Sequence, residues 1–365
     1  MISKGKAKNK LKIQILAGGI SHERDISLKS GRRVADALLE VGAEVVIREP
    51  DDKLLSNIKK DKPDVIWPCL HGASGEDGAL RDILSLTGVP FVGATASASR
   101  LAWDKSIAKI IVEQNGIQTP ASITLPKDTF RELDADGVLK AVTSVINFPL
   151  VVKPARSGSA LGITVVNKAE ELSRAMIDAY VYCDVAIIEK FVKGTELAIS
   201  VIDLGSGPIA LPAVEIEPVS GRYGYQERYV AGETNYYVPA RVTTAVADRA
   251  SKVAVSAHEA LGLRHLSRID VIVDSKGTVW FLEANVLPGL TETSLLPQAV
   301  IAEGSSLGDV YYSLAEAAYR QRGAGYAAGR RHDGAGLGAV RGGSSTVRGS
   351  EDRCSCVPGG RQQSR

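Results

Sequence analysis

The chain has 365 residues, of which 44% are hydrophobic and 24% charged, and its formal net charge is +2. This length predicts more than one domain, and the composition is that of a globular protein. No apolar run approaches the ~18 residues of a membrane span, and the basic segment 1–10, expected to be flexible, precedes no apolar signal region. The four scattered cysteines form no metal or disulfide pattern. We therefore expect a cytoplasmic protein with no membrane partner.

The positive charge is concentrated near the C-terminal end. Residues 323–365 contain seven Arg against three acidic residues and therefore carry +4, which leaves −2 for residues 1–322. Eleven of these 43 residues are Gly, which predicts a disordered tail. Arg-rich sequence could contact nucleic acid, and a passive extension is the other interpretation. Because the body lacks a basic signature, we expect no nucleic-acid partner.

The first hundred residues alternate between predicted strands and helices. Strands are predicted at 11–16, 45–48, 65–70 and 89–93, with helices ending near 41 and 87. This alternation is typical of a doubly wound α/β unit, whose ligands bind beyond the strand ends. Two polar loops with Glu23 and His71 lie there, although Glu23 could simply cap a helix and His71 could be structural. Neither loop has the dinucleotide-binding G-x-G-x-x-G pattern.

The middle of the chain carries two lysines in settings that suit phosphate. One helix is predicted over 97–115 and contains Lys105. A strand at 150–154 contains Lys153 and continues through a Gly/Ser loop into a strand at 163–166. Backbone N–H groups of such a loop could close over phosphates, and a plain hairpin turn is the alternative. The loop differs from a Walker loop, because it has no Gly-Lys-Ser/Thr and enters no helix.

Further along, residues 186–201 read as strand, bend and strand. Such a bend could present backbone groups to an adenine edge, with Glu196 near the ribose hydroxyls, or it could be an ordinary connection between domains. Residues 221–235 are polar, aromatic and rich in Gly, which is typical of a lid loop. Helices are predicted at 244–261 and 307–320.

The stretch from Leu266 to Ala299 holds the densest group of polar residues. It predicts a hairpin with strands at 269–273 and 278–284. If Val273 pairs with Thr278, Arg268 lies opposite Glu283 and Asp270 opposite Phe281. Alternation then gives one polar face and one core face. The polar face holds Arg268, Asp270, Glu283 and Asn285, and the core face holds Ile269, Val271, Val273, Trp280 and Leu282.

This polar face has the oxygen ligands that Mg²⁺ prefers, and Mg²⁺ completes its shell with water and substrate phosphates. An exposed hairpin with a surface ion pair is the alternative. The glycine-containing turn after Asn285 leads to a helix start near Ser294. Exposed N–H groups at such a start attract anions, for example a substrate carboxylate.

Taken together, these stretches resemble the D-alanine–D-alanine ligases of the ATP-grasp superfamily, from about Leu11 to Gln321. The matching pieces are GGISHERDISL, HGASGEDG, WDKSIAK, VVKPARSGSALG, EKFVKGTE, RYVAGET, SRIDV and LEANVLPGLTETSLLP. The resemblance implies an α/β (α+β) ATP-grasp fold with three domains at 11–96, 97–191 and 192–322, and ATP between two antiparallel sheets. It also implies ligation of two D-alanines for peptidoglycan synthesis, two Mg²⁺ or Mn²⁺ ions per site and a homodimer.

The resemblance assigns roles to individual residues. It implies that ATP is bound by Lys105, Lys153, Ser159, Glu189, Lys190, Val192, Glu196 and Arg228, and the metal ions by Asp270, Glu283 and Asn285. The amino-acid substrates would meet Glu23, His71, Ser294 and Leu295. The catalytic set would be Glu23, Ser159, Tyr229, Arg268, Gly289 and Ser294. In that set Arg268 and the Gly289 N–H stabilise the oxyanion, while Ser159 and Tyr229 join Glu23 in bridging the lid loops.

The chain departs from the family pattern in its loops. Ser157-Gly-Ser-Ala160 replaces the usual Glu-Gly-Ser-Ser, Arg228 replaces a Lys, and Thr293 replaces a frequent His. Arg228 keeps the charge with a different geometry. These differences leave open a ligase of the same fold with another donor or acceptor, for instance in antibiotic biosynthesis or resistance. A non-catalytic nucleotide-binding protein is the alternative from another class.

Overall fold

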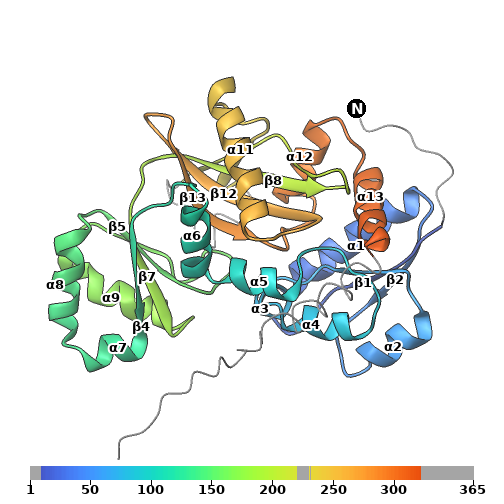
Figure 1. Ribbon diagram of the computed structural model, residues 1–365, viewed down its shortest axis with the longest axis horizontal. Helices are drawn as coiled ribbons and strands as arrows, with labels where there is room; N and C mark the ends of the chain where they lie inside the picture. The colour runs from blue at the N-terminus through green and yellow to red at the C-terminus, as the bar shows by residue number, and fades with distance from the viewer. Residues whose placement is uncertain (1–9, 220–229, 231, 322–365) are drawn as a thin grey trace, which may run out of the picture. The chain divides into compact units, whose positions relative to one another are not determined.

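The computed structural model describes residues 10–219, 230 and 232–321 (Figure 1). The predicted tail, the basic start, and the predicted site residues Arg228 and Tyr229 lie outside these residues. The described part of the chain forms three β-sheets with helices packed on them. None of its helices is long and apolar enough to cross a membrane.

The first sheet is parallel, with strand order β2-β1-β3. Its elements are β1 (Lys12–Leu16), α1 (Arg24–Glu40), β2 (Glu44–Arg48), α2 (Leu54–Asp61), β3 (Val65–Pro68), α3 (Ala73–Glu76) and α4 (Ala79–Leu86). Parallel neighbours need crossover connections, which α1 and α2 supply. The predicted alternation is therefore confirmed. The strand predicted at 89–93 is reduced to a single bridge between Ile66 and Phe91.

The helix predicted over 97–115 is wrong in one respect, because it is two helices, α5 (Ala96–Trp103) and α6 (Lys105–Gln114). The break falls at Asp104, whose backbone is extended. The Asp104 carboxylate accepts hydrogen bonds from the backbone N–H groups of Ser106 and Ile107. An Asp in this position satisfies N–H groups that the first helical turn leaves open. Lys105 therefore stands at the start of a helix instead of in its middle.

The second sheet is antiparallel, with strand order β4-β7-β5-β6. Its strands are β4 (Ser122–Pro126), β5 (Leu150–Pro154), β6 (Thr164–Val166) and β7 (Val185–Lys190). Three helices flank it: α7 (Lys127–Glu132), α8 (Ala135–Val145) and α9 (Ala169–Tyr180) (Figure 1). They share a core with the sheet that includes Leu139, Met176 and Ile188. The other sheet face is thus free to line a cavity.

The third sheet is the largest, with strand order β11-β10-β8-β12-β13 and β9 paired to β8. Its strands are β8 (Gly194–Asp203), β9 (Pro208–Ala210), β10 (Val214–Pro218), β11 (Thr234–Tyr237), β12 (Leu266–Asp274) and β13 (Val279–Asn285). The helix α11 (Thr244–Ala260) shares a buried core with β8, β12 and β13 (Figure 1). The last helices are α12 (Leu295–Ala302) and α13 (Leu307–Arg320).

The predicted pairing of Asp270 with Phe281 and of Arg268 with Glu283 is wrong, because the hairpin contains a β-bulge. Arg268 pairs with Asn285 and Asp270 with Glu283, whereas Val271 pairs with Phe281. Leu282 is therefore an extra residue on β13. Because a shift of one residue moves side chains to the other face, Phe281 enters the core. The prediction that Trp280 and Leu282 face the core is wrong, since neither belongs to it. The predicted polar face survives, since residues 268, 270, 283 and 285 remain on one side.

Candidate active site in two adjoining cavities

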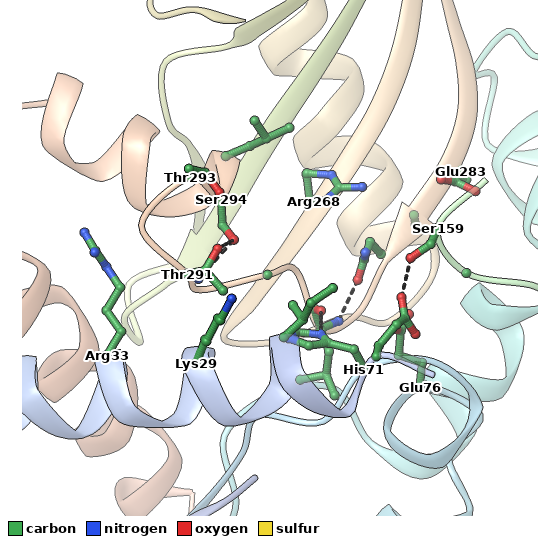
Figure 2. A pocket seen from close by; sticks show the side chains of 18 of the residues that line it. Lys29, Arg33, His71, Glu76, Ser159, Arg268, Glu283, Thr291, Thr293 and Ser294 are labelled. Carbon is green, nitrogen blue, oxygen red and sulfur yellow. Dashed lines mark hydrogen bonds between the residues drawn. The ribbon is translucent and has the colours of Figure 1, made fainter. Parts of the chain in front are cut away.

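Two cavities meet at Glu283, which lines both of them. The first, here called the α1 cavity, has a volume of about 710 Å³ and is walled along one side by α1 (Figure 2). The second, the sheet cavity, has a volume of about 850 Å³ and lies between residues of the second and third sheets. Volumes of this order are typical of small-molecule sites.

Every predicted site residue in the described part of the chain lines one of these cavities. The α1 cavity contains Glu23, His71, Lys105, Ser159, Arg268, Glu283, Asn285, Gly289, Ser294 and Leu295. The sheet cavity contains Lys153, Glu189, Lys190, Val192, Glu196, Asp270 and Glu283. Residues from 23 to 295 are thus brought together by the fold.

A buried carboxylate between two lysines forms one wall of the sheet cavity. Glu189 accepts from the Lys153 Nζ at 2.6 Å and from the Lys109 Nζ at 2.7 Å. Burial alone would raise the pKa of Glu189, but the two ammonium groups outweigh it and hold the pKa below its usual range. Lys153 lines the cavity and Lys109 does not. Sequence reasoning missed Lys109, which is 80 residues from its partner.

At the junction of the cavities, two cations stand beside two carboxylates. Arg268 donates from Nε to Asp270 Oδ1 at 2.7 Å and from Nη2 to Oδ2 at 2.8 Å. Such a two-point pair fixes the guanidinium plane. Lys105 Nζ lies 3.3 Å from Glu283 Oε2 and donates to the Ser157 carbonyl at 2.8 Å. The charged groups of Arg268 and Lys105 are therefore both held in place at the junction of the two cavities.

The oxygen donors of this face suit a divalent cation bound together with a polyanion. Asp270 and Glu283 are cross-strand partners, and Asn285 lies two residues further along the same face. Within the described ranges no group of three His, Cys, Asp or Glu could hold a metal by itself. Mg²⁺ needs few protein ligands, because water and phosphates complete its shell. The sheet cavity is lined by six carboxylates against three lysines, so a triphosphate would need such cations there.

Glu23 stands at the N-terminal end of α1, inside the α1 cavity. It accepts a hydrogen bond from the Ser159 hydroxyl (Figure 2). Gly72 is pressed against it, since a Cβ on Gly72 would lie 2.5 Å from Glu23 Oε2. The Gly72 N–H donates to Glu76 Oε1 at 2.9 Å. These contacts fix the position of a carboxylate in the wall of the α1 cavity.

Glu76 is a buried acid in the HGASGEDG stretch, and the sequence alone did not indicate a role for it. Burial, and secondly the charge of Glu23, raises the pKa of Glu76 to about 8. The group is therefore mostly protonated at neutral pH. Consequently Glu76 adds little negative charge to this end of the cavity.

We expect Glu76→Gln to remove a pH dependence of stability. Because the folded pKa is raised, the folded state holds a proton that the unfolded state loses, so wild-type stability falls as pH rises from about 4.5 to about 8. The limiting slope is about 1.4 kcal/mol per pH unit. Urea unfolding at several pH values should show the fall in the wild type and a flatter profile in the variant. Parallel profiles would contradict the protonation assigned to Glu76.

The opposite end of the α1 cavity is formed by the turn that leads into α12. The Ser294 hydroxyl accepts from the Thr291 N–H at 3.0 Å and lies 2.8 Å from the Thr291 hydroxyl. Ser294 makes no side-chain cap bond to α12. A Cβ on Gly289 would lie 2.7 Å from the Ser294 hydroxyl. The turn is thus closely packed. Ser294 and Leu295, at the start of α12, line the cavity, and the first N–H groups of a helix have no partner within it.

His71 joins the two sides of this cavity. Its Nδ1 lies 3.2 Å from the Leu287 carbonyl and its Nε2 lies 3.1 Å from the Ser30 hydroxyl. A carbonyl only accepts, so Nδ1 carries the proton and Nε2 accepts from Ser30. Burial lowers the pKa of His71, which favours this neutral form. The contacts show that His71 positions the loop at Leu287; a contact with substrate, implied by the resemblance, stays a prediction.

The chain is similar to known proteins in sequence. Residues 111–316 match the family model described as D-ala D-ala ligase C-terminus. The D-alanine–D-alanine ligase of Pelotomaculum thermopropionicum is 36% identical, with 84% of this chain and 96% of the relative covered. That of Bordetella petrii is 37% identical over 83% of this chain and 90% of the relative.

Solved structures agree with the sequence relatives. VanG D-Ala:D-Ser ligase from Enterococcus faecalis gives a TM-score of 0.72 at 28% identity, covering 85% of this chain and 100% of the other. D-alanine–D-alanine ligase from Bacillus anthracis complexed with ATP gives 0.69 at 28% identity, covering 86% and 98%. The predicted ATP-grasp ligase fold is confirmed by these matches, and the chain belongs to the D-alanine–D-alanine ligase family.

Proposed function

We propose that this protein joins two D-alanines into D-alanyl-D-alanine at the expense of ATP, for peptidoglycan precursor synthesis in the cytoplasm. The observation that carries the proposal is the meeting of two cavities at Glu283 in a chain of this family. The sheet cavity offers lysines for phosphates. The α1 cavity has the Glu23 carboxylate at one end and the start of α12 at the other. A reaction between a nucleotide and small amino acids would take place at the junction.

The sheet cavity is the proposed ATP site. The Bacillus anthracis relative was solved with ATP, which supports nucleotide binding by this fold. Lys153 and Lys105 would meet the phosphates. Glu189, Lys190 and Val192, which line this cavity, would line the adenine, with the Glu189 carboxylate held by two lysines. Glu196, which also lines this cavity, would bind the ribose.

Asp270, Glu283 and Asn285 would hold Mg²⁺ or Mn²⁺, two ions per site, which would neutralise phosphate charge during transfer. In this chain, Arg268 orients Asp270 from the α1 side. Lys105 does the same for Glu283. The ligand set and the cations that align it therefore come from β12, β13 and the start of α6.

Two steps account for the chemistry. A carboxylate oxygen of the first D-alanine attacks the γ-phosphorus of ATP, the bond to the ADP oxygen breaks, and an acyl phosphate forms. The amine of the second D-alanine then attacks the acyl carbon, loses a proton, and displaces inorganic phosphate as the amide bond forms. Lys105 and Lys153 balance charge in the first step. Arg268 and the Gly289 N–H would stabilise the oxyanion in the second, at ~10²–10³ in rate per donor.

The same geometry orients the two amino acids. Glu23 would bind the ammonium group of the first D-alanine, with Ser159 fixing the carboxylate. The carboxylate of the second would sit at the N–H groups of Ser294 and Leu295, at the start of α12. Tyr229 and Arg228 would complete the lid. The domain boundaries near 96 and 191 and the homodimer remain predictions.

ADP release with a panel of D- and L-amino acids tests the proposal. We expect release that depends on D-alanine, and D-alanyl-D-alanine identified by mass spectrometry. ATP binding by calorimetry, with no ADP formed under any amino acid, would instead support the non-catalytic alternative. Release with other amino acids but not with D-alanine would reject the D-alanine assignment and favour a ligase of different specificity. The likeness to a D-Ala:D-Ser ligase makes D-serine the first alternative acceptor to include.

A further inference from the structure

The α1 cavity extends beyond the turn at Ser294 to a cationic face of α1. Lys29 and Arg33 line this end of the cavity. Figure 2 shows both side chains rising from α1 on the side where the Thr291–Ser294 turn lies; Lys29 reaches toward Thr291, and Arg33 stands further along the helix. Residues four apart on a helix lie on one face, so both cations belong to the face of α1 that borders this cavity. Neither residue was singled out from the sequence.

These cations have no anionic partner within the described ranges. Arg33 Nε is buried and has no hydrogen-bond acceptor there. Asp36 and Glu292 also line the cavity, but both are exposed, and neither is paired with Lys29 or Arg33. Leaving a buried donor unsatisfied is costly. An anionic ligand group at this place would remove that cost.

The length of α1 separates this face from the carboxylate expected to hold the first amino acid. With a rise of about 1.5 Å per residue, Lys29 lies roughly 9 Å and Arg33 roughly 15 Å along the axis from Glu23. A dipeptide spans at most about 7 Å. Measured along α1, the backbone position of Arg33 therefore lies beyond the end of a dipeptide that starts at Glu23. A side chain on the acceptor would extend the ligand toward the end of the cavity that Lys29 and Arg33 line.

We propose that Lys29 and Arg33 form a subsite for an acidic side chain, so that the enzyme accepts a D-amino acid with a side-chain carboxylate, such as D-aspartate or D-glutamate, as second substrate. The inference rests on the proposed ligase function and extends it to the acceptor. A guanidinium matches a carboxylate in a two-point geometry, and an ammonium group beside it adds charge. The neutral amides D-asparagine and D-glutamine have the same shape without the charge.

The test compares acceptors of equal shape with D-alanine as donor. We expect kcat/KM for D-aspartate or D-glutamate to exceed that for the matching amide at least tenfold. Arg33→Gln and Lys29→Gln should each bring this ratio toward one, while Lys252→Gln on the exposed side of α11 should not. Lys29 is exposed, so its variant keeps the test informative if Arg33→Gln folds poorly. The Lys29→Glu, Arg33→Glu double variant should prefer D-lysine.

Three outcomes would overturn the proposal. If D-alanine is joined but no acidic acceptor is preferred, the subsite fails and the ligase function stands. If both Gln variants weaken D-alanine and acidic acceptors equally, the cations serve the terminal carboxylate instead. If no acceptor yields a dipeptide, the ligase function itself fails, and the subsite with it.

Discussion

Glu283→Gln is expected to lower kcat/KM for dipeptide formation by ~10³-fold or more, because a loss of several kcal/mol of charge stabilisation has this effect on rate. Glutamine keeps the size of the side chain but removes the negative charge. Glu283 lines both cavities and faces Lys105 at 3.3 Å. The variant would leave Lys105 without its countercharge and remove a metal ligand at the junction.

The measurement is dipeptide formation by mass spectrometry alongside ADP release. Glu259→Gln is the matched control, because it makes the same chemical change on the exposed surface of α11, away from both cavities. The control should retain activity within about twofold of wild type. An undiminished yield of dipeptide from Glu283→Gln would refute the proposed role of Glu283 as a metal ligand and countercharge of Lys105.

Lys153→Met is expected to damage both stability and ATP use. Lys153 and Lys109 share the buried Glu189, and removing one partner of a buried ion pair typically costs about 3–5 kcal/mol. Lys109 remains to hold Glu189, so we expect the lower end of this range. Lys153 also lines the sheet cavity, so KM for ATP should rise at least tenfold.

Lys109→Met separates these two effects. It breaks the same cluster and also removes a donor to the Pro120 carbonyl at 2.8 Å, but Lys109 does not line the cavity. Urea unfolding should show a similar loss of stability in both variants. The larger rise in KM for ATP should belong to Lys153→Met alone. Equal effects on KM would mean that Lys153 acts only as a structural partner of Glu189.

The polar face of the last hairpin could be predicted from sequence because alternation along a strand is a local property. The pairing across the hairpin could not. Trp280, Phe281 and Leu282 are three consecutive large apolar residues, so their pattern does not show which of them faces the core. The bulge at Leu282 decides this, and it places Phe281 in the core that β13 shares with α11.

Other differences have equally specific causes. Asp104 is a typical N-cap residue, so the break between α5 and α6 was present in the sequence, although the apolar pattern on both sides suggested one helix. The ion pair between Lys109 and Glu189 could not be predicted from the sequence, because no local pattern links residues 80 positions apart. Lys29 and Arg33 resemble any exposed cations on a helix until the fold places the turn at Ser294 opposite them.

The most direct test of the central proposal follows one oxygen atom. The carboxylate of the first amino acid is proposed to attack ATP where the two cavities meet at Glu283. Wild-type enzyme supplied with D-alanine labelled with ¹⁸O in its carboxylate should release inorganic phosphate that carries one labelled oxygen for each dipeptide formed. Dipeptide accompanied by unlabelled phosphate would contradict an acyl phosphate, and with it the proposed attack of the first amino acid on ATP.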